Sequence, residues 1–541
     1  MKKLFFSSFF LCFIILFDLT VSGQWISRYN GPGNGIDEAF AVTYDASSNV
    51  YVTGSSMGSG SNLDFATVKY NSSGAEQWAV RYNGPANFID IGNAVAVDGA
   101  GSVYVTGLSA GTTSFTDFAT IKYNSAGQEQ WAVRYNGPSN GTDEAFSVAV
   151  DGSGNVYVTG QSLSGTNYDF ATIKYNSAGV QQWVSRYNGP QNSIDNPAVV
   201  RVDGSGNVYV TGGSTGSGSG LDFATVKYNS TGQEQWAVRY NGTNNADDIP
   251  SAMFVDAAGN VFVTGGSSGS TSSNDYVTIK YNSAGQEQWN SRYNGTGNDN
   301  DVSFGLAVSG AGNVYVTGSS IGQGSATDYA TVMYNSSGVQ QWVTRYNGPN
   351  NTSDDASAID VDVSGNAFVT GASNSGGTNL DYLTLKYNPA GVLIWEQRYN
   401  GPANGVDAAL SVCVDGSGNA YVTGNSQGSG SSSDYATIKY SVLTAVNPEG
   451  SEIPSSYRLY NNYPNPFNPA TTIKFDLPVQ ANTKLIVYDV TGKTVKLLVN
   501  QVMSAGSHSF SFDAAGFSSG VYFYKVQAGD FSEIKKMVLI K

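Results

Sequence analysis

Histidine and cysteine are almost absent from this chain. Its 541 residues include one histidine, His508, and two cysteines. The rest of the chain therefore offers no imidazole base, no histidine metal ligand and no Ser-His-Asp arrangement for nucleophilic catalysis. Cys12 lies in an N-terminal segment that we expect to be removed, so Cys413 remains alone and no internal disulfide is expected. We expect Cys413 to be a buried, unreactive thiol in a strand.

Long hydrophobic runs are also scarce. The one long run, Leu4 to Phe17, is too short for a membrane-spanning helix. Lys2 and Lys3 precede it and small residues follow, which predicts a secretory signal peptide over residues 1–23, cut between Gly23 and Gln24. No cysteine lies near the cut, so we expect no lipid anchor. No other apolar run is long enough to cross a membrane, so we expect no transmembrane segment in the mature chain.

Charged residues make up only 13% of the chain, and the formal net charge is −15. The acidic excess lies in the repeats described below, because the two ends of the chain are slightly basic. A negative surface of this kind argues against nucleic acid and anionic lipid as partners. It is compatible with cations, basic peptides or neutral glycans.

Tryptophan marks an internal repeat. The eight tryptophans are 52 or 53 residues apart, and each begins the phrase Trp-x-x-Arg-Tyr-Asn-Gly. A spacing this regular indicates one supersecondary unit repeated along the chain. The tryptophans are Trp25, Trp78, Trp131, Trp183, Trp236, Trp289, Trp342 and Trp395.

One repeat contains four strand-like runs, at 145–151, 155–160, 169–175 and 182–188. Valine, tyrosine, phenylalanine and threonine dominate them, and Asp-Gly-Ser-Gly or Asn-Ser-Ala-Gly turns separate them. No helical periodicity is present. Four antiparallel strands in about 50 residues are typical of a propeller blade, so we predict an all-β, eight-bladed β-propeller over residues 24–440.

The phase of the repeats predicts how the propeller closes. The chain begins with a fourth strand, residues 24–31, and its last repeat ends after a third strand at Tyr440. Pairing these two segments would complete the eighth blade and remove the exposed edges of an open sheet. The alternative is an open solenoid of stacked repeats, which would normally need distinct caps at both ends. We see no such caps in the sequence.

The repeat ends at Tyr440. Residues 441–456 are interpreted as a linker, and residues 457–541 as short alternating strands that form a small antiparallel β-sandwich. This last segment contains Tyr-Pro-Asn-Pro-Phe-Asn-Pro at 463–469, Leu-Ile-Val-Tyr-Asp-Val-Thr-Gly at 485–492 and Lys-Lys-Met-Val-Leu-Ile-Lys at 535–541.

These motifs resemble the type A sorting domain of the type IX (Por) secretion system of Bacteroidetes-like bacteria. The resemblance implies entry into the periplasm through the signal peptide and then passage across the outer membrane, with the secretion machinery as partner of residues 457–541. Cleavage of the domain, with surface attachment or release, usually follows. The sorting-motif residues that the resemblance implies are Tyr463, Pro464, Asn465, Pro466, Phe467, Asn468, Pro469, Gly520, Tyr522, Lys535 and Lys536.

The repeats resemble the bacterial β-propeller repeat known as SBBP. Its typical phrase, Asp-x-x-Gly-Asn-x-Tyr-Val-Thr-Gly, is present at 151–160 and at 415–424. The resemblance covers residues 24–440 and implies a fold. That family has no common activity, so the resemblance does not identify a ligand.

Each repeat places two aspartates at fixed positions. One lies six residues after the glycine of Tyr-Asn-Gly, on the connection from a fourth strand to the next first strand; the other begins the third strand. In an up-and-down blade these connections emerge on the same face, so that face should carry both sets. We call the first set the first ring: Asp37, Asp90, Asp143, Asp195, Asp248, Asp301, Asp354 and Asp407. The second ring is Asp64, Asp117, Asp169, Asp222, Asp275, Asp328, Asp381 and Asp434.

Two interpretations of the rings are open. Carboxylates bind Ca²⁺, which is the one cofactor that the sequence suggests. Alternatively, each aspartate caps its own loop by accepting backbone N–H bonds. Repetition in every blade favours capping, because a binding site usually needs asymmetry. The Asp-Gly-Ser-Gly-Asn turns of the opposite face lack the later glutamate of a calcium loop and are interpreted as turns.

The remaining repeated residues suggest packing rather than chemistry. We expect the arginine of each tryptophan phrase to be solvated or paired with aspartate at the rim, and the tryptophans and tyrosines to pack between blades. The blades differ most in Gly/Ser loops after Val-Thr-Gly, on the face of the aspartates. Loops on a rigid scaffold are common binding sites, although these loops are small and polar and show no aromatic anchor set.

The sequence therefore predicts an exported, non-catalytic binding or structural propeller, with a glycan or protein ligand on the Asp-rich face. The competing class is an extracellular glycan-active enzyme that uses two carboxylates. A quinoprotein is a second enzymatic alternative, because Asn124-Ser-Ala-Gly-x-x-x-Trp131 loosely resembles the Gly-to-Trp turns of eight-bladed quinoprotein dehydrogenases.

Overall fold

The computed structural model describes residues 25–269, 273–374, 379–441, 456–503 and 506–541. The expected signal peptide, Gln24 and most of the 441–456 linker lie outside these ranges. The chain divides into two compact units, Met1–Val442 and Leu443–Lys541. Within the described ranges every regular element is a β-strand, apart from the 3-10 turn η1 (Pro349–Asn351).

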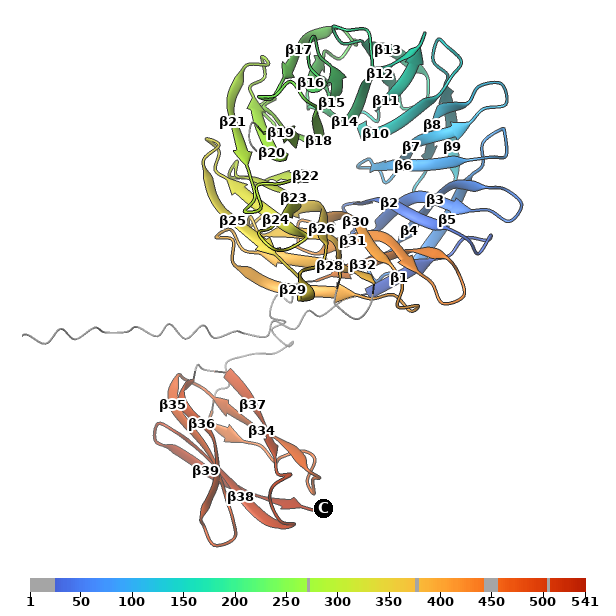
Figure 1. Cartoon of the computed structure of the whole chain (residues 1–541). Coiled ribbons are helices and arrows are strands. Elements are labelled where there is room, and N and C mark those ends of the chain that lie inside the picture. The colour runs from blue at the N-terminus through green and yellow to red at the C-terminus, as the bar shows by residue number, and fades with distance from the viewer. Residues whose placement is uncertain (1–24, 270–272, 375–378, 442–455, 504–505) are drawn as a thin grey trace, which may run out of the picture. The chain divides into compact units, whose positions relative to one another are not determined.

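The first unit consists of four-stranded antiparallel sheets, eight of them in the described ranges, arranged around a centre (Figure 1). The innermost strands are β2 (Asp37–Tyr44), β6 (Asp90–Val97), β10 (Asp143–Val150), β14 (Asp195–Val202), β18 (Asp248–Val255), β22 (Asp301–Val308), β26 (Asp354–Val361) and β30 (Asp407–Val414). The second strands are β3 (Val50–Met57), β7 (Val103–Ala110), β11 (Val156–Ser164), β15 (Val208–Thr215), β19 (Val261–Ser268), β23 (Val314–Ile321), β27 (Ala367–Asn374) and β31 (Ala420–Gln427).

The outer half of each sheet comes from the last two strands of a repeat. The third strands are β4 (Leu63–Tyr70), β8 (Thr116–Tyr123), β12 (Asn167–Tyr175), β16 (Leu221–Tyr228), β20 (Asn274–Tyr281), β24 (Thr327–Tyr334), β28 (Leu380–Tyr387) and β32 (Ser433–Tyr440). The outermost strands are β5 (Glu76–Tyr82), β9 (Glu129–Tyr135), β13 (Gln181–Tyr187), β17 (Glu234–Tyr240), β21 (Glu287–Tyr293), β25 (Gln340–Tyr346), β29 (Leu393–Tyr399) and β1 (Trp25–Tyr29).

The N-terminal strand completes the last sheet, as the phase of the repeats predicts. β1 pairs antiparallel with β32, so that Trp25 lies opposite Lys439 and Tyr29 opposite Tyr435. Each innermost strand contacts the innermost strand of the next sheet, and β30 contacts both β26 and β2. The sheets therefore form a closed ring, a β-propeller, rather than an open solenoid.

Apolar side chains fill the space between neighbouring sheets. Tyr51 and Phe65 of the first sheet pack with Val103, Val105 and Ile121 of the second, and all five are buried. Corresponding clusters lie between the other sheets. Because every sheet buries side chains on both faces, the strands are nearly continuous in apolar and small residues rather than alternating.

Seven of the eight tryptophans, Trp25 to Trp342, pack on a turn of the following sheet. The Trp25 indole donates to the backbone oxygen of Ser72, 3.2 Å away. In that turn Gly74 has φ +83°, and a Cβ there would lie 2.5 Å from the Trp25 ring. The turn thus requires glycine both for its backbone conformation and for the close approach of the indole. The same tryptophan-to-turn bond recurs from Trp78 to Trp342.

The second unit is a small β-sandwich. One sheet contains β33 (Arg458–Leu459), β34 (Ala470–Leu477) and β37 (Gly506–Asp513); the other contains β36 (Thr494–Met503), β35 (Ala481–Tyr488), β38 (Gly520–Ala528) and β39 (Phe531–Leu539). Their inner faces share one apolar core that includes Phe475, Leu485, Tyr524 and Met537.

Candidate functional site on the loop face

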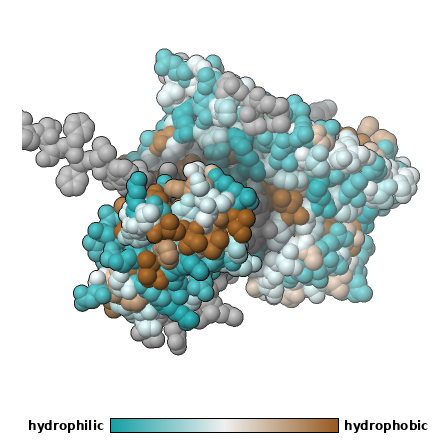
Figure 2. Space-filling view, turned by 90° about the horizontal axis from the view of Figure 1, so that it is seen from below, coloured by the Kyte–Doolittle hydropathy of each residue, from teal (hydrophilic) through white to brown (hydrophobic). Residues whose placement is uncertain are grey.

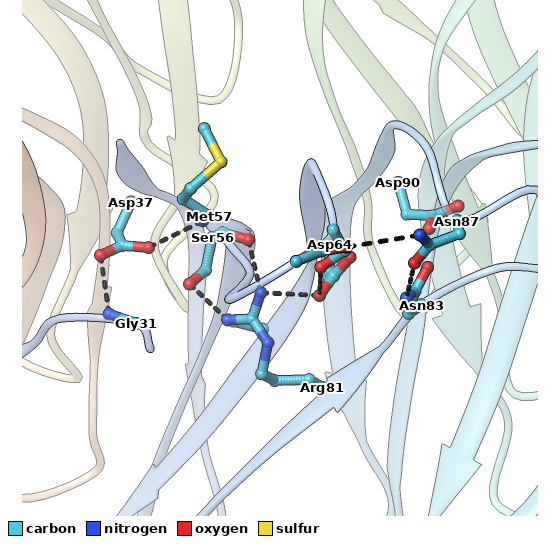
Figure 3. A network of polar contacts seen from close by, with 12 residues as sticks. Gly31, Asp37, Ser56, Met57, Asp64, Arg81, Asn83, Asn87 and Asp90 are labelled. Atoms are coloured by element: carbon cyan, nitrogen blue, oxygen red, sulfur yellow. Dashed lines mark hydrogen bonds and ion pairs between the residues drawn. The ribbon is translucent and has the colours of Figure 1, made fainter. Parts of the chain in front are cut away.

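The first ring caps the loops that join one sheet to the next. Asp37 accepts hydrogen bonds from the backbone N–H of Gly31 at 2.7 Å and of Met57 at 3.0 Å (Figure 3). In every repeat the ring carboxylate accepts the N–H of the glycine six residues earlier, at 2.5–2.7 Å. All eight aspartates are at most 1% exposed. Burial raises the pKa of each of these carboxyl groups.

The second ring pairs with arginine. Arg81 of β5 lies 2.8 Å from the Asp64 carboxylate of β4. The corresponding ion pair is present in seven repeats, at 2.7–3.1 Å. The second-ring aspartates are 3–6% exposed. The sequence allowed the arginines to be either solvated or paired with aspartate, and these seven are paired.

Each arginine also links two sheets. Arg81 donates to the hydroxyl and the backbone oxygen of Ser56, beside Asp64 (Figure 3). It also donates to the Tyr29 hydroxyl of the preceding sheet. A hydrogen bond from this arginine to the tyrosine of the preceding sheet is present in all eight repeats, at 2.7–3.5 Å. The serine hydroxyl also lowers the pKa of the first-ring carboxyl, although burial outweighs it. Aspartate, serine, arginine and tyrosine thus form one repeated network.

This network leaves the rings little capacity for a metal ion. The sixteen carboxylates are buried, and backbone amides or guanidinium groups already bond to at least fifteen of them, eight in the first ring and seven in the second. Among the described residues, no cluster of three or more histidine, cysteine, aspartate or glutamate side chains could hold a metal. The geometry favours the capping interpretation for the first ring, whereas the second ring forms ion pairs with arginine instead. Calcium binding at either ring stays a prediction to be tested.

The opposite face carries the Asp-Gly-Ser-Gly turns. Asp151 accepts the backbone N–H groups of Ser153 and Asn155 and the Tyr157 hydroxyl. Burial alone would raise its pKa, but these bonds hold the pKa of Asp151 below its ordinary value. A cavity of about 460 Å³ lies between this turn and the next, lined in part by Tyr157, Lys174 and Asp203. The aspartates of these turns are engaged in turn geometry, in agreement with the sequence interpretation.

Two exposed aromatic rings distinguish the loop face of the second sheet. Phe88 is 54% exposed and Phe115 is 78% exposed. Their loops are joined by bonds from Ala110 N–H to Ile89 O and from Gly111 N–H to Phe115 O. The sequence interpretation of these loops as lacking aromatic anchors overlooked this pair. Phe88 takes the place of Gly35 in the first repeat, and Phe115 takes the place of Asn62.

Local packing explains why a large ring fits in this loop and not in that of the first repeat. A Cβ on Gly35 would lie 2.8 Å from Cγ of Met57. The counterpart of Met57 in the second sheet is Ala110, which leaves room beside it for Phe88. The signal in the sequence was therefore a paired change, small to large at one position and large to small at the other.

One carboxylate near the centre of the ring departs from the repeat. Asp360 in β26 accepts the backbone N–H of Val361 and of Val414 in the next innermost strand, both at 2.8 Å. Burial raises the pKa of Asp360 to about 6. It also contributes, after burial, to the raised pKa of the Cys413 thiol, which is only partly exposed. Other repeats carry residues such as Ala96 or Phe254 at the Asp360 position.

The sorting-motif residues lie in the second unit. Phe467 is buried in its core, whereas Tyr463, the three prolines and Asn468 of the motif are exposed. Asn465 accepts the N–H of Val538 at 2.9 Å, which ties the motif to β39. Tyr522 donates to Ser518 O, and Gly520 begins β38. Lys535 pairs with Glu533, and Lys536 lies beside it on β39.

Comparisons with known families agree with both resemblances. Residues 461–541 match the family described as a secretion system C-terminal sorting domain, and residues 130–169 match the β-propeller repeat SBBP. The chain thus carries SBBP-type propeller repeats and a type IX sorting domain, which directs it to the cell surface or the extracellular space. None of the described residues forms a helix long and apolar enough to cross a membrane.

None of the curated protein sequences matches the chain. Among solved structures, it is similar to PorZ, an essential surface component of the type IX secretion system of Porphyromonas gingivalis, with TM-score 0.40 and 16% identity over 94% of this chain and 66% of that one. It is also similar to the polysaccharide lyase Uly1, with TM-score 0.41 and 10% identity over 64% and 90% of the two chains. A third is an α-L-arabinofuranosidase from Fusarium graminearum, with TM-score 0.35, 12% identity, and 54% and 91% coverage.

Proposed function

We propose that the propeller is a non-catalytic binding module that the sorting domain delivers to the outside of the cell. The observation that carries the proposal is the state of the sixteen ring aspartates. All sixteen are buried; the eight of the first ring accept backbone N–H bonds, and seven of the second ring pair with arginine. A general acid or nucleophile must reach its substrate within hydrogen-bond distance, which buried caps do not do.

The binding surface that fits this scaffold is the loop face of the second sheet. Phe88 and Phe115 expose aromatic rings there, next to loops that elsewhere carry glycine, serine or asparagine. Exposed aromatic side chains on rigid elements are common binding anchors, because they bury a large area and lose little conformational freedom. The net charge of −15 favours an uncharged or cationic ligand. A neutral glycan or a protein fits this description.

A binding assay with matched variants tests the proposal. The mature chain is incubated with neutral polysaccharides and with extracellular proteins, and retention is compared between the unaltered chain and Phe88→Ser combined with Phe115→Asn. These replacements are the residues of other repeats, Ser193 and Asn62. We expect the double variant to lose at least about tenfold in affinity, the loss of about 1.4 kcal/mol of contact free energy.

The matched control is Val180→Gln. Val180 is 57% exposed in a turn on the opposite face, and other repeats carry glutamine at its position. The control should bind as the unaltered chain does. Equal binding by the Phe88/Phe115 variant and the control would refute the assigned surface. New reducing ends released from any polysaccharide would refute the non-catalytic role and establish the glycan-active alternative.

A further inference from the structure

The outer face of one sheet of the sorting domain is unusually apolar. In the sheet β36-β35-β38-β39, the inward residues Leu485, Val487 and Tyr524 belong to the core. The alternate residues point away from it, and they include Ile486 and Tyr488 of β35 and Phe523 of β38. Outward positions of a sandwich are normally polar. Figure 2 shows hydrophobic residues gathered on the surface of this unit.

The register brings these side chains together. Leu497 lies opposite Ile486, and Tyr488 lies opposite Phe523. Leu497 is 50% exposed, Ile534 of β39 is 55% exposed and Val490, in the turn after β35, is 68% exposed. A shallow pocket of about 470 Å³ lies over the Tyr488–Phe523 pair, with Val490 and Ile534 among its walls. We call this surface the β35–β38 pocket.

Lysines surround the β35–β38 pocket. Lys525 lines it and lies opposite Ile486 and Ile534 in the neighbouring strands, and Lys536 lies opposite Phe523. The carboxylate at its edge, Asp489, accepts hydrogen bonds from Thr491 and the Lys493 N–H on one oxygen. The surface therefore combines an apolar cavity with two lysines, Lys525 and Lys536, beside a single carboxylate that is turned to its own loop. It complements an apolar side chain that is flanked by carboxylates.

The other sheet provides the contrast. In β34 the inward residues Ile473 and Phe475 are buried in the core, and the outward positions are Thr472 and Lys474. This outer face is polar, as expected for a sandwich in water. The apolar pocket is thus a property of one face and not a general feature of a small domain with a limited core.

We infer that the β35–β38 pocket is the surface by which the sorting domain docks on the secretion machinery, through a component that inserts an apolar side chain flanked by carboxylates. The inference rests on the sorting role of residues 461–541. An apolar anchor in a desolvated pocket supplies most of the binding free energy at such interfaces, and the charges around it set the association rate and the choice of partner.

Export of the full chain tests the assignment, with the fraction retained in the periplasm as the readout. Lys525→Glu reverses a charge at the pocket, and Lys474→Glu makes the same change on the polar sheet. Ile534→Glu and Val490→Glu place a carboxylate at exposed pocket positions, so the core is not altered. We expect the three pocket variants to be retained several times more than the unaltered chain, and Lys474→Glu and Lys525→Arg to be exported normally.

The other outcomes are distinguishable. A chain that lacks residues 457–541 is the reference for lost sorting, and its normal export would refute the sorting role itself. If that chain is retained while the three pocket variants are exported normally, the pocket assignment is wrong. Equal melting temperatures of the purified full-length variants show that retention does not come from misfolding; a lower melting temperature that accounts for the retention overturns the assignment. A dimer of the full chain that dissociates on Ile534→Glu would identify a second copy as the occupant instead.

Discussion

Arg81 in β5 donates a hydrogen bond to the hydroxyl of Tyr29 in β1, 3.3 Å away. Tyr29 belongs to the N-terminal strand, and Arg81 belongs to the sheet next to it in the ring. The N-terminal strand is therefore held on two sides, by pairing with β32 in its own sheet and by the arginine of the following sheet. The same arginine–tyrosine contact is present between the sheets of each remaining neighbouring pair. The junction between the two chain ends therefore has the same contacts as the other junctions.

Removal of the N-terminal strand should strongly destabilise the propeller. Deletion of residues 24–31 exposes the edge of β32 and leaves Gly74 without the Trp25 indole. Trp25→Ala alone is expected to cost at least about 2 kcal/mol, less than the about 3–5 kcal/mol of a fully buried tryptophan, because the ring is partly exposed. Thermal unfolding followed by circular dichroism measures both changes. An unchanged melting temperature after the deletion would show that the strand does not close the ring.

The contributions of Asp64 and Arg81 to the free energy of unfolding should be coupled. Arg81→Met leaves the Asp64 carboxylate buried without its guanidinium partner and is expected to cost about 1–3 kcal/mol. Asp64→Asn combined with Arg81→Met should cost less than the sum of the two single changes, because the unpaired charge is gone. Urea unfolding of the four proteins gives the coupling. Glu76→Gln, at an exposed position of β5 that is glutamine in β13, is the control and should change stability by less than about 0.5 kcal/mol. Additive effects of the two network changes would contradict the pairing.

Stability should depend on pH through Asp360. Its pKa is about 6 in the folded protein against 3.8 for an unperturbed carboxyl, because it is buried. Folding therefore favours the protonated form, and the stability that this group contributes falls as pH rises from about 4 to about 6. Asp360→Asn removes this dependence. The free energy of unfolding of the variant, relative to that of the unaltered chain, should therefore increase by up to about 3 kcal/mol from pH 4 to pH 7. Urea unfolding at the two pH values measures the gain, and a constant difference would show that the Asp360 pKa is ordinary.

The repeat predicted the fold well because each feature of it has one local explanation. The tryptophan spacing defines the unit, and turns such as Asn71 to Gly74 separate its strands with an asparagine that caps and a glycine at positive φ. The position of Trp25 relative to Tyr440 then determines which strand completes the last sheet. The repeat unit and its phase are enough to predict all of this, including the pairing of β1 with β32.

The candidate site was harder to predict because it depends on contacts between residues of different strands. Asp64 and Arg81 are 17 residues apart, on consecutive strands. The sequence left the arginine either solvated or paired with an aspartate, and only the register of β4 and β5 shows that the two lie 2.8 Å apart. The exposure of Phe88 depends on Ala110 in another strand. The raised pKa of Asp360 depends on its burial against a neighbouring sheet. Phe88, Ala110 and Asp360 are positions at which one repeat differs from the others. The sequence analysis concentrated on the residues that the repeats share and did not consider these differences.

The central claim is that the two aspartate rings hold the propeller together and do not bind a ligand. The most direct test is the thermal melt of the mature chain in Ca²⁺ and then in EDTA. Because the ring carboxylates are already bonded to amides and arginines, we expect the two melting temperatures to agree. A ligand at 100 times its dissociation constant would add about 2.7 kcal/mol to the free energy of unfolding. A calcium-dependent rise of that size would make the rings metal ligands and would contradict the account.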